Sequence, residues 1–255
     1  MDESFDFKKY FETRLGRPVH SYYVKKDALF GPSYFINDAY VLKKYDEPLN
    51  KELSLERLDS VHEIIKNDKT SEKVLYIDRN NLVKITKLVH GDLSYEDEPS
   101  ISQVRNVAKA LKKLHKHVSE YDVPLDIVSL FYKYKDLSEE HLDKIYENRI
   151  VREFNNIKDK IPIGLCHNNL NKDNIIYRFD SVFLINYELA NINYTYFDLA
   201  SYIHENKLSQ KNKEEFLKTY FGAKYNSLKE KRVEILIRFL EGFMYYYQQY
   251  LLNRK

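Results

Sequence analysis

Residues that could carry out chemistry are concentrated in the segment 165–205. One short loop holds His167, Asn169 and Asn174, and Asn186 follows a nearby apolar run. Phosphoryl transfer requires cations that neutralise the phosphates, a group that orients the attacking hydroxyl and a cleft that excludes water. In protein kinases one Asp and one Asn hold the metal ions, and a second Asp accepts the hydroxyl proton. The spacing of the four polar residues matches these positions, so we predict a site for phosphoryl transfer.

Two of these residues are amides where this chemistry needs carboxylates. Asn169 carries no charge and cannot accept a proton near neutral pH, and loss of a general base typically costs ~10²–10⁴ in rate. Asn186 can coordinate a hard cation through its amide oxygen. Its missing charge matters, because a unit-charge pair at ~4 Å is worth about 4 kcal/mol at an effective dielectric of about 20. We therefore expect a weakened metal site and impaired catalysis.

Two nearby acids could compensate for the missing charge. Glu188 follows Asn186 by two residues, so on a strand the two side chains would share a face. Asp173 directly precedes Asn174 in the loop. Either carboxylate could hold Mg²⁺, and the sequence leaves both possibilities open.

The residues that must position this site fall into two regions. The first 90 residues are predicted to form a small mixed sheet with one inserted helix, and the remainder is mainly helical. The predicted strands of the first region cover 18–24, 39–44, 73–78 and 81–89, with helices over 5–15 and 51–66. The later helices cover 102–117, 139–157 and 228–251, and two short strands cover 175–177 and 182–186.

Three segments resemble the choline/ethanolamine kinase family, within the aminoglycoside-phosphotransferase superfamily of kinase-like folds. The family carries a CHNDLxxxNIL loop, an IDFEYA strand and an FDLA segment. Here these read CHNNLNKDNII (166–176), INYELA (185–190) and FDLA (197–200). Weaker likenesses in the same order are AYVLKK (39–44), NLVKITKLVHG (81–91), ALKKLHKH (110–117) and EEFLKTYFG (214–222).

The resemblance implies an α+β, bilobal protein-kinase-like fold that uses ATP and Mg²⁺. Residues 1–90 would form a small β-rich lobe that binds the nucleotide, and residues 91–255 a larger helical lobe with the catalytic hairpin. In the loop, His167 would be structural and Asn174 a metal ligand. Asp198 would brace the loop from the FDLA segment. Asn169 and Asn186 stand at the positions of the catalytic and metal-binding Asp.

The resemblance also implies the residues that contact the nucleotide. Lys43 is the expected phosphate-binding cation, with Lys44 as its competitor. The backbone of Leu88, Val89 and His90 would contact adenine. The helix that supplies a Glu to the phosphate cation in the family shows Glu52, Ser54 and Glu56 here.

The acceptor implied by the resemblance is a small amino alcohol such as choline or ethanolamine. The family binds the ammonium group with Trp, which this chain lacks. Phe243, Tyr245 and Tyr246, followed by Tyr247, stand in the corresponding segment, and a Tyr face can bind a cation. Aromatic residues at helical spacing are also typical of a core, so both interpretations stay open.

Composition limits the other functions. Hydrophobic residues make up 43% and charged residues 31% of the 255, and the net charge of +2 gives no electrostatic reason to expect nucleic-acid or membrane binding. The single cysteine, Cys166, excludes an internal disulfide. No apolar run suggests membrane insertion, so we expect a cytoplasmic protein whose oligomeric state the sequence leaves open.

Two functional hypotheses follow. The first is an enzyme that transfers the γ-phosphoryl group of ATP to a small amino alcohol, with activity impaired by Asn169 and Asn186. The second is an inactive pseudokinase that binds a nucleotide or another ligand, or acts as a scaffold. The two amides could result from natural drift or from deliberate replacement, and the absence of Trp favours drift.

Overall fold

The computed structural model describes residues 5–26, 30–46, 54–92, 98–120 and 122–252. Contacts divide the chain into two compact units, Met1–Gly91 with Phe183–Glu188, and Asp92–Val182 with Leu189–Lys255. The boundary predicted at residue 90 assigns the segment 183–188 to the second domain, whereas the structure places it in the first unit. The fold class is α+β, as predicted.

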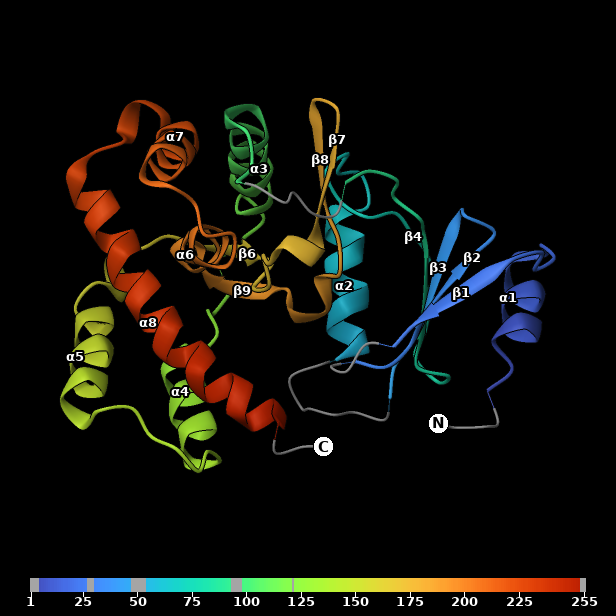
Figure 1. Ribbon diagram of the computed structural model, residues 1–255, viewed down its shortest axis with the longest axis horizontal. Helices are drawn as coiled ribbons and strands as arrows, with labels where there is room; N and C mark the ends of the chain where they lie inside the picture. Colours follow the sequence, from blue (N-terminus) through green and yellow to red (C-terminus); the bar gives the residue numbers. More distant parts are fainter. Residues whose placement is uncertain (1–4, 27–29, 47–53, 93–97, 121, 253–255) are drawn as a thin grey trace. The chain divides into compact units, whose positions relative to one another are not determined.

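The first unit is built on an antiparallel sheet of five strands (Figure 1). The strand order is β1-β2-β3-β5-β4, so β3 pairs with β5 in the middle of the sheet. The strands are β1 (Tyr22–Lys25), β2 (Ser33–Ile36), β3 (Tyr40–Lys44), β4 (Val74–Asp78) and β5 (Val83–Lys87), with helices α1 (Phe7–Leu15) and α2 (Leu55–Ile65).

Local sequence explains where these helices begin and what they cover. The side chain of Asp6 caps α1 by accepting from the Lys9 N–H, and Gly16 ends the helix in the left-handed region, where glycine is favoured. Ser54 caps α2 in the same way. Apolar residues of α1 and the sheet share one core, made of Phe11, Ile36, Leu42, Val83 and Ile85. Helix α2 buries Leu58, Val61, His62 and Ile65.

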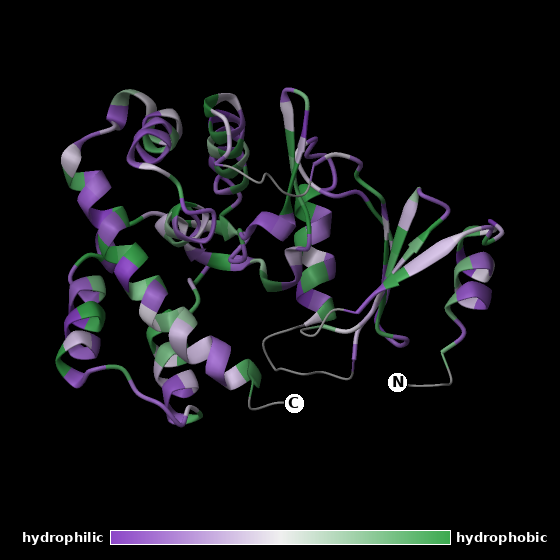
Figure 2. Ribbon diagram, viewed as in Figure 1, coloured by the Kyte–Doolittle hydropathy of each residue, from purple (hydrophilic) through white to green (hydrophobic). Residues whose placement is uncertain are grey.

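The second unit is mainly helical. Helix α6 packs against α8, α3 against α7, and both α4 and α5 against α8 (Figure 1). Hydrophobic and hydrophilic residues alternate around α3 and α8, as expected of helices that bury one side (Figure 2). The helices are α3 (Ile101–Leu114), α4 (Ile127–Asp136), α5 (Lys144–Asn155), α6 (Thr195–Glu205), α7 (Gln210–Phe221) and α8 (Ser227–Leu252).

Four short strands carry the chain through the candidate site. Strand β6 (Ile163–Cys166) pairs with β9 (Asn191–Tyr194), and β7 (Ile175–Arg178) pairs with β8 (Ser181–Leu184). The sequence did not predict β2, α4, β6 or β9. It also extended the strand of β8 to residue 186, whereas β8 ends at Leu184. Short turns of 3₁₀-helix, Lys158–Lys160, Lys172–Asn174, Tyr187–Leu189 and Gly222–Lys224, complete the regular structure.

Within the described residues, no helix combines the length and the apolar composition that crossing a bilayer requires.

Candidate active site

The loop after β6 is held in place by one buried carboxylate. Asp198, at the start of α6, accepts hydrogen bonds from the backbone N–H of His167 (2.8 Å) and of Asn168 (2.8 Å). Its side chain is fully enclosed. Asn168 has a φ of 61°, a conformation that Asn tolerates better than most residues. The brace predicted for Asp198 is therefore present in the geometry of this unit.

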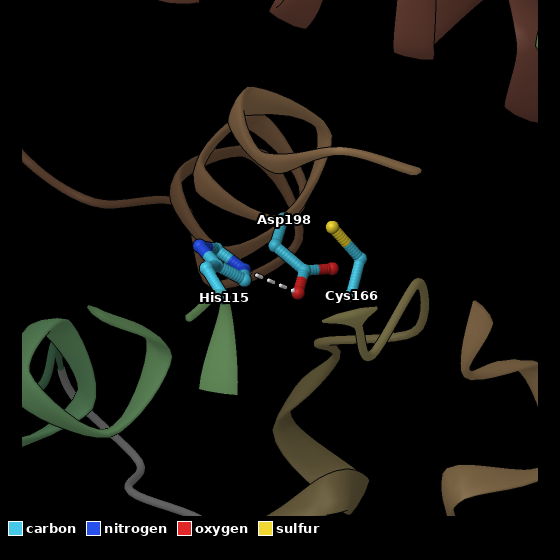
Figure 3. Close-up of side chains that lie close together, drawn as sticks. All are labelled: His115, Cys166 and Asp198. Carbon is cyan, nitrogen blue, oxygen red and sulfur yellow. Dashed lines mark hydrogen bonds and ion pairs between the residues drawn. The ribbon is translucent and has the colours of Figure 1, made fainter. Parts of the chain in front are cut away.

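Asp198 has a third donor that the sequence did not reveal. His115, at the C-terminal end of α3, places Nε2 3.0 Å from Asp198 Oδ2 (Figure 3). Its Nδ1 lies 2.7 Å from the hydroxyl of Tyr220. Burial raises the pKa of Tyr220, so this hydroxyl stays protonated and can donate to Nδ1, which leaves the Nε2–H to donate to Asp198.

Cys166 lies beside this pair, so the cluster contains three possible metal ligands (Figure 3). The ligand atoms of His115, Cys166 and Asp198 lie within 4.8 Å of one another. A metal would need a thiolate and a bare imidazole nitrogen. Burial raises the pKa of Cys166 well above its usual value, and both nitrogens of His115 already have partners. We therefore interpret the cluster as a hydrogen-bonded support for the loop.

Further side-chain amides fix the rest of the loop. Asn174, which is buried, donates from Nδ2 to the backbone oxygen of Asn169 (2.8 Å). Asn206, the C-cap residue of α6, donates to the backbone oxygen of Leu170 (2.8 Å). The side chain of Asn169 is half-buried, and its Oδ1 accepts from Asn171 Nδ2 (3.1 Å). The loop therefore presents an oriented amide at the position of the expected base.

The strand β3 distinguishes between the two candidate lysines. Lys43 is buried, and its ammonium lies 3.6 Å from Glu188 Oε1 and over the ring of Phe30. Lys44 instead donates to the backbone oxygen of Tyr45 (3.2 Å). Adjacent residues of a strand point to opposite faces, so of these two lysines Lys43 is the one that faces Glu188.

The segment after β5 was predicted to contact adenine. The N–H of Leu88 donates to the backbone oxygen of Ala39 (2.8 Å), so this donor is already used within the sheet. His90 is exposed, with its ring 4.0 Å from the carboxylate of Asp38. The N–H of Leu88 is therefore not available to bind adenine. The predicted backbone contact with adenine is kept for Val89 and His90.

Glu188 does not lie where the sequence argument placed it. Asn186 follows the end of β8 with a φ of 63°, and Glu188 sits in the 3₁₀ turn Tyr187–Leu189. The two residues are not on one strand, so the argument that they share a strand face is wrong. Asp173, the other acid considered, is exposed on the surface of the loop.

The carboxylate of Glu188 is buried among cations of the first unit. Its Oε1 accepts from the Tyr45 hydroxyl (2.9 Å) and from Lys84 Nζ (3.0 Å), with Lys43 at 3.6 Å. Burial by itself would raise the pKa of Glu188, but the charges of Lys43 and Lys84 lower it overall. The second oxygen, Oε2, is buried and has no hydrogen-bond partner among the described residues. Glu188 is therefore ionised. Its Oε1 meets Tyr45, Lys84 and Lys43, and its Oε2 has no hydrogen-bond partner among the described residues.

The aromatic segment of α8 divides into two environments. Tyr246 is fully buried, donates to Glu147 Oε2 (2.7 Å) and packs edge-on against Phe131. Its ring face is covered by protein, so the expectation that Tyr246 contacts a ligand is wrong. Tyr245 packs edge-on against Tyr246, with its hydroxyl 3.4 Å from Glu140.

Phe243 belongs to the other environment. This half-buried ring lies 5.5 Å from Tyr134 and 6.2 Å from Tyr247, measured between ring centroids. Tyr134 also contacts Tyr247 and Tyr250. Phe243 and Tyr247 are thus the residues of the segment that share one aromatic cluster.

The helix α2 and the residues before it were expected to supply a Glu that pairs with the phosphate-binding lysine. Glu52 lies outside the described residues, and Ser54 is the N-cap of α2. Glu56 is exposed on that helix. The acids that surround the buried lysines are instead Glu72 and Glu188.

No family model matches the chain. Over 158 residues, 56% of the chain, it is 25% identical to the protein LicA of Haemophilus influenzae. The match spans 57% of the length of one such LicA sequence and 45% of another, so the chain spans only about half of the curated relatives it matches.

Solved structures match over most of the chain. The choline kinase LicA from Streptococcus pneumoniae has a TM-score of 0.76 at 17% identity, over 97% of this chain and 90% of that one. LicA in complex with AMP gives 0.73 at 17% identity, over 97% and 90%. A choline/ethanolamine kinase family protein from Mesorhizobium loti gives 0.72 at 17% identity, over 91% and 80%. The resemblance seen in the sequence is thereby confirmed, and the chain has the kinase-like fold of these proteins.

Proposed function

We propose that the chain is a choline-kinase-like phosphotransferase that moves the γ-phosphoryl group of ATP to the hydroxyl of a small amino alcohol at a reduced rate. The observation that carries this proposal is the braced loop. Two backbone N–H groups of the loop bind the buried carboxylate of Asp198, and Asn169 projects from the loop that they fix. A loop held in this way can orient a hydroxyl before transfer.

The proposed nucleotide contacts lie in the first unit. The buried cation of Lys43 would neutralise phosphate charge. The backbone of Val89 and His90 would contact adenine, because the N–H of Leu88 is already bonded. The likeness to a LicA structure that contains AMP supports nucleotide binding.

Asn169 sets the expected rate. Its amide oxygen can accept a hydrogen bond from the attacking hydroxyl and so orient it. It cannot take up the proton, which must pass to an oxygen of the phosphate or to water during transfer. We therefore expect turnover below that of a site with a carboxylate base, by the ~10²–10⁴ that general-base catalysis typically contributes.

A divalent cation is the cofactor that this chemistry implies, and Glu188 fits it. An ionised carboxylate oxygen that is buried without a donor is costly unless a cation meets it, and Glu188 Oε2 is such an oxygen among the described residues. We assign Glu188 Oε2 and the amide oxygen of Asn186 to Mg²⁺, which prefers oxygen ligands. When bound, the ion would neutralise charge on the phosphates.

The amino-alcohol acceptor is assigned to the aromatic segment of α8. Phe243 is the half-buried member of the cluster with Tyr134 and Tyr247, and an aromatic face attracts a quaternary ammonium group. Tyr245 stays a candidate of the same kind. Tyr246 is left out because its ring is enclosed.

One observation favours a second candidate, an inactive nucleotide-binding protein. The Oδ1 of Asn169 already accepts from Asn171 within the loop, and this bond competes with the acceptor hydroxyl. A chain with this arrangement could keep its nucleotide and lose transfer.

One assay separates the candidates. The purified chain is incubated with ATP, Mg²⁺ or Mn²⁺ and a panel of amino alcohols, and phosphorylated product is followed by mass spectrometry. Product from the unaltered chain supports the enzyme. A thermal shift with ATP but no product, even in Asn169→Asp/Asn186→Asp, supports the second candidate. Neither product nor thermal shift would overturn both.

A further inference from the structure

A buried lysine on β5 contacts the same carboxylate as Lys43. Lys84 lies directly opposite Lys43 in the pairing of β3 with β5, and its exposed fraction is 2%. Its ammonium donates to Glu188 Oε1 (3.0 Å) and to Glu72 Oε1 (2.9 Å). Lys84 therefore joins two carboxylates that lie more than 100 residues apart in the sequence.

The segments that carry these carboxylates are held together. The N–H of Glu72 donates to the backbone oxygen of Leu184 (3.1 Å), and the N–H of Leu184 donates to Thr70 (2.8 Å). The hydroxyls of Ser71 and Tyr187 lie 2.7 Å apart. The segments that carry Glu72 and Glu188 are thus fixed to each other. The ammonium of Lys84 therefore has little freedom to leave either carboxylate.

Burial makes this arrangement informative. A lysine removed from water is favourable only where acids offset its lost hydration, and the ammonium of Lys84 donates to a carboxylate oxygen of both Glu72 and Glu188. An apolar residue on β5 would fill this position without that requirement. The buried charge therefore points to a task beyond packing.

We propose, resting on the function proposed above, that Lys84 is a positioning residue that holds Glu188 for the metal ion. Lys84 and the Tyr45 hydroxyl both donate to Oε1. Their donation fixes the carboxylate from one side and leaves Oε2 without a protein donor among the described residues. Lys84 acts through Glu188, whereas Lys43 is the cation assigned to the phosphates.

Glu72 completes the positioning role. It accepts from Lys84 Nζ (2.9 Å), and its Oε1 also lies 3.7 Å from His62 Nε2 of α2. Without Glu72, the full charge of Lys84 would act on Glu188. Lys84 therefore shares its positive charge between Glu72 and Glu188. Glu188 keeps part of its negative charge, which can attract a cation.

The test compares nucleotide affinity with and without metal. The dissociation constant of ADP is measured by calorimetry in Mg²⁺ and in EDTA, and their ratio gives the metal enhancement. For Lys84→Met we expect this enhancement to fall at least tenfold, while the affinity in EDTA changes less than threefold because Lys43 remains. A purely structural role would change both affinities together. Lys87→Met is the matched control, since Lys87 is an exposed lysine on the same strand.

A second variant covers the risk that a lone buried charge prevents folding. Lys84→Met combined with Glu72→Gln removes both charges of the pair, and circular dichroism checks its fold. An enhancement retained within threefold in the folded double variant would overturn the inference and leave the proposed function standing. Absence of ADP binding by the unaltered chain would overturn the proposed function itself.

Discussion

His115 Nε2 lies 3.0 Å from Asp198 Oδ2, so the acid that holds the candidate loop is itself held from another helix. The opposite ring nitrogen meets the hydroxyl of Tyr220. One buried imidazole therefore links α3, α6 and α7. Gly164 on β6 allows the backbone of His115 to lie close to this strand, because a Cβ at residue 164 would overlap with the backbone oxygen of His115.

Replacement of His115 should destabilise the second unit. In His115→Phe the buried carboxylate of Asp198 loses one of its three donors, which should lower the free energy of unfolding by about 1–3 kcal/mol. Urea unfolding followed by circular dichroism measures this change. Lys116→Gln, at an exposed neighbouring position, should stay within about 0.5 kcal/mol of the unaltered chain. Equal effects of the two substitutions would show that the link to Asp198 adds nothing.

Restoring a carboxylate at residue 169 should accelerate the proposed reaction. Asn169→Asp supplies a group that can accept the hydroxyl proton, so kcat should rise by ~10²–10⁴ with the preferred amino alcohol. Steady-state product formation measures the change. Ser181→Asp adds the same charge at an exposed residue of β8 and should leave kcat within a few-fold. A similar gain in both variants would mean that charge, and not proton acceptance, is limiting.

The parts of the site that were predictable are those whose spacing is local. The loop from His167 to Asn174 and the start of α6 at Asp198 lie on short segments with fixed separations, and the hydrogen bonds of Asp198 connect them as expected. Lys43 was preferred over Lys44, and the alternation of β3 places the two on opposite faces.

The parts that could not be predicted depend on pairing between distant segments. Lys84, Glu72 and His115 gain their partners only through tertiary contacts, so no local pattern marks them. Glu188 was misplaced because the argument extended a strand through Asn186, where the positive φ breaks the alternation. For Tyr246, helical spacing shows a buried face but not its partner, and Glu147 is the acid that its hydroxyl meets.

Neutralising Glu188 should cost much of the stability of the first unit. In Glu188→Gln the buried ammonium of Lys84 keeps, among the described residues, the carboxylate of Glu72, and the ion pair of Lys43 with residue 188 is lost. Breaking a buried ion pair from one side typically costs about 3–5 kcal/mol. We expect a loss of this size in urea unfolding. Glu63→Gln, at an exposed acid of α2, is the control. Surface ion pairs contribute about 0–1 kcal/mol, so a loss within that range for Glu188→Gln would contradict the buried network.

His62 on α2 should make the stability of the chain sensitive to mild acid. Burial lowers its pKa from the usual 6.5 to about 4, since the opposing charge of Glu72 does not offset burial. Between these two pH values the unfolded chain binds a proton that the folded chain does not, so the free energy of unfolding falls as the pH falls from 6.5. The difference between the two pKa values corresponds to about 3 kcal/mol at the lower end. In His62→Gln, which cannot titrate, this component should disappear, as urea unfolding at a series of pH values would show. Parallel curves for the two proteins between pH 6.5 and 4 would mean that the buried imidazole binds its proton equally well in the folded and unfolded chain.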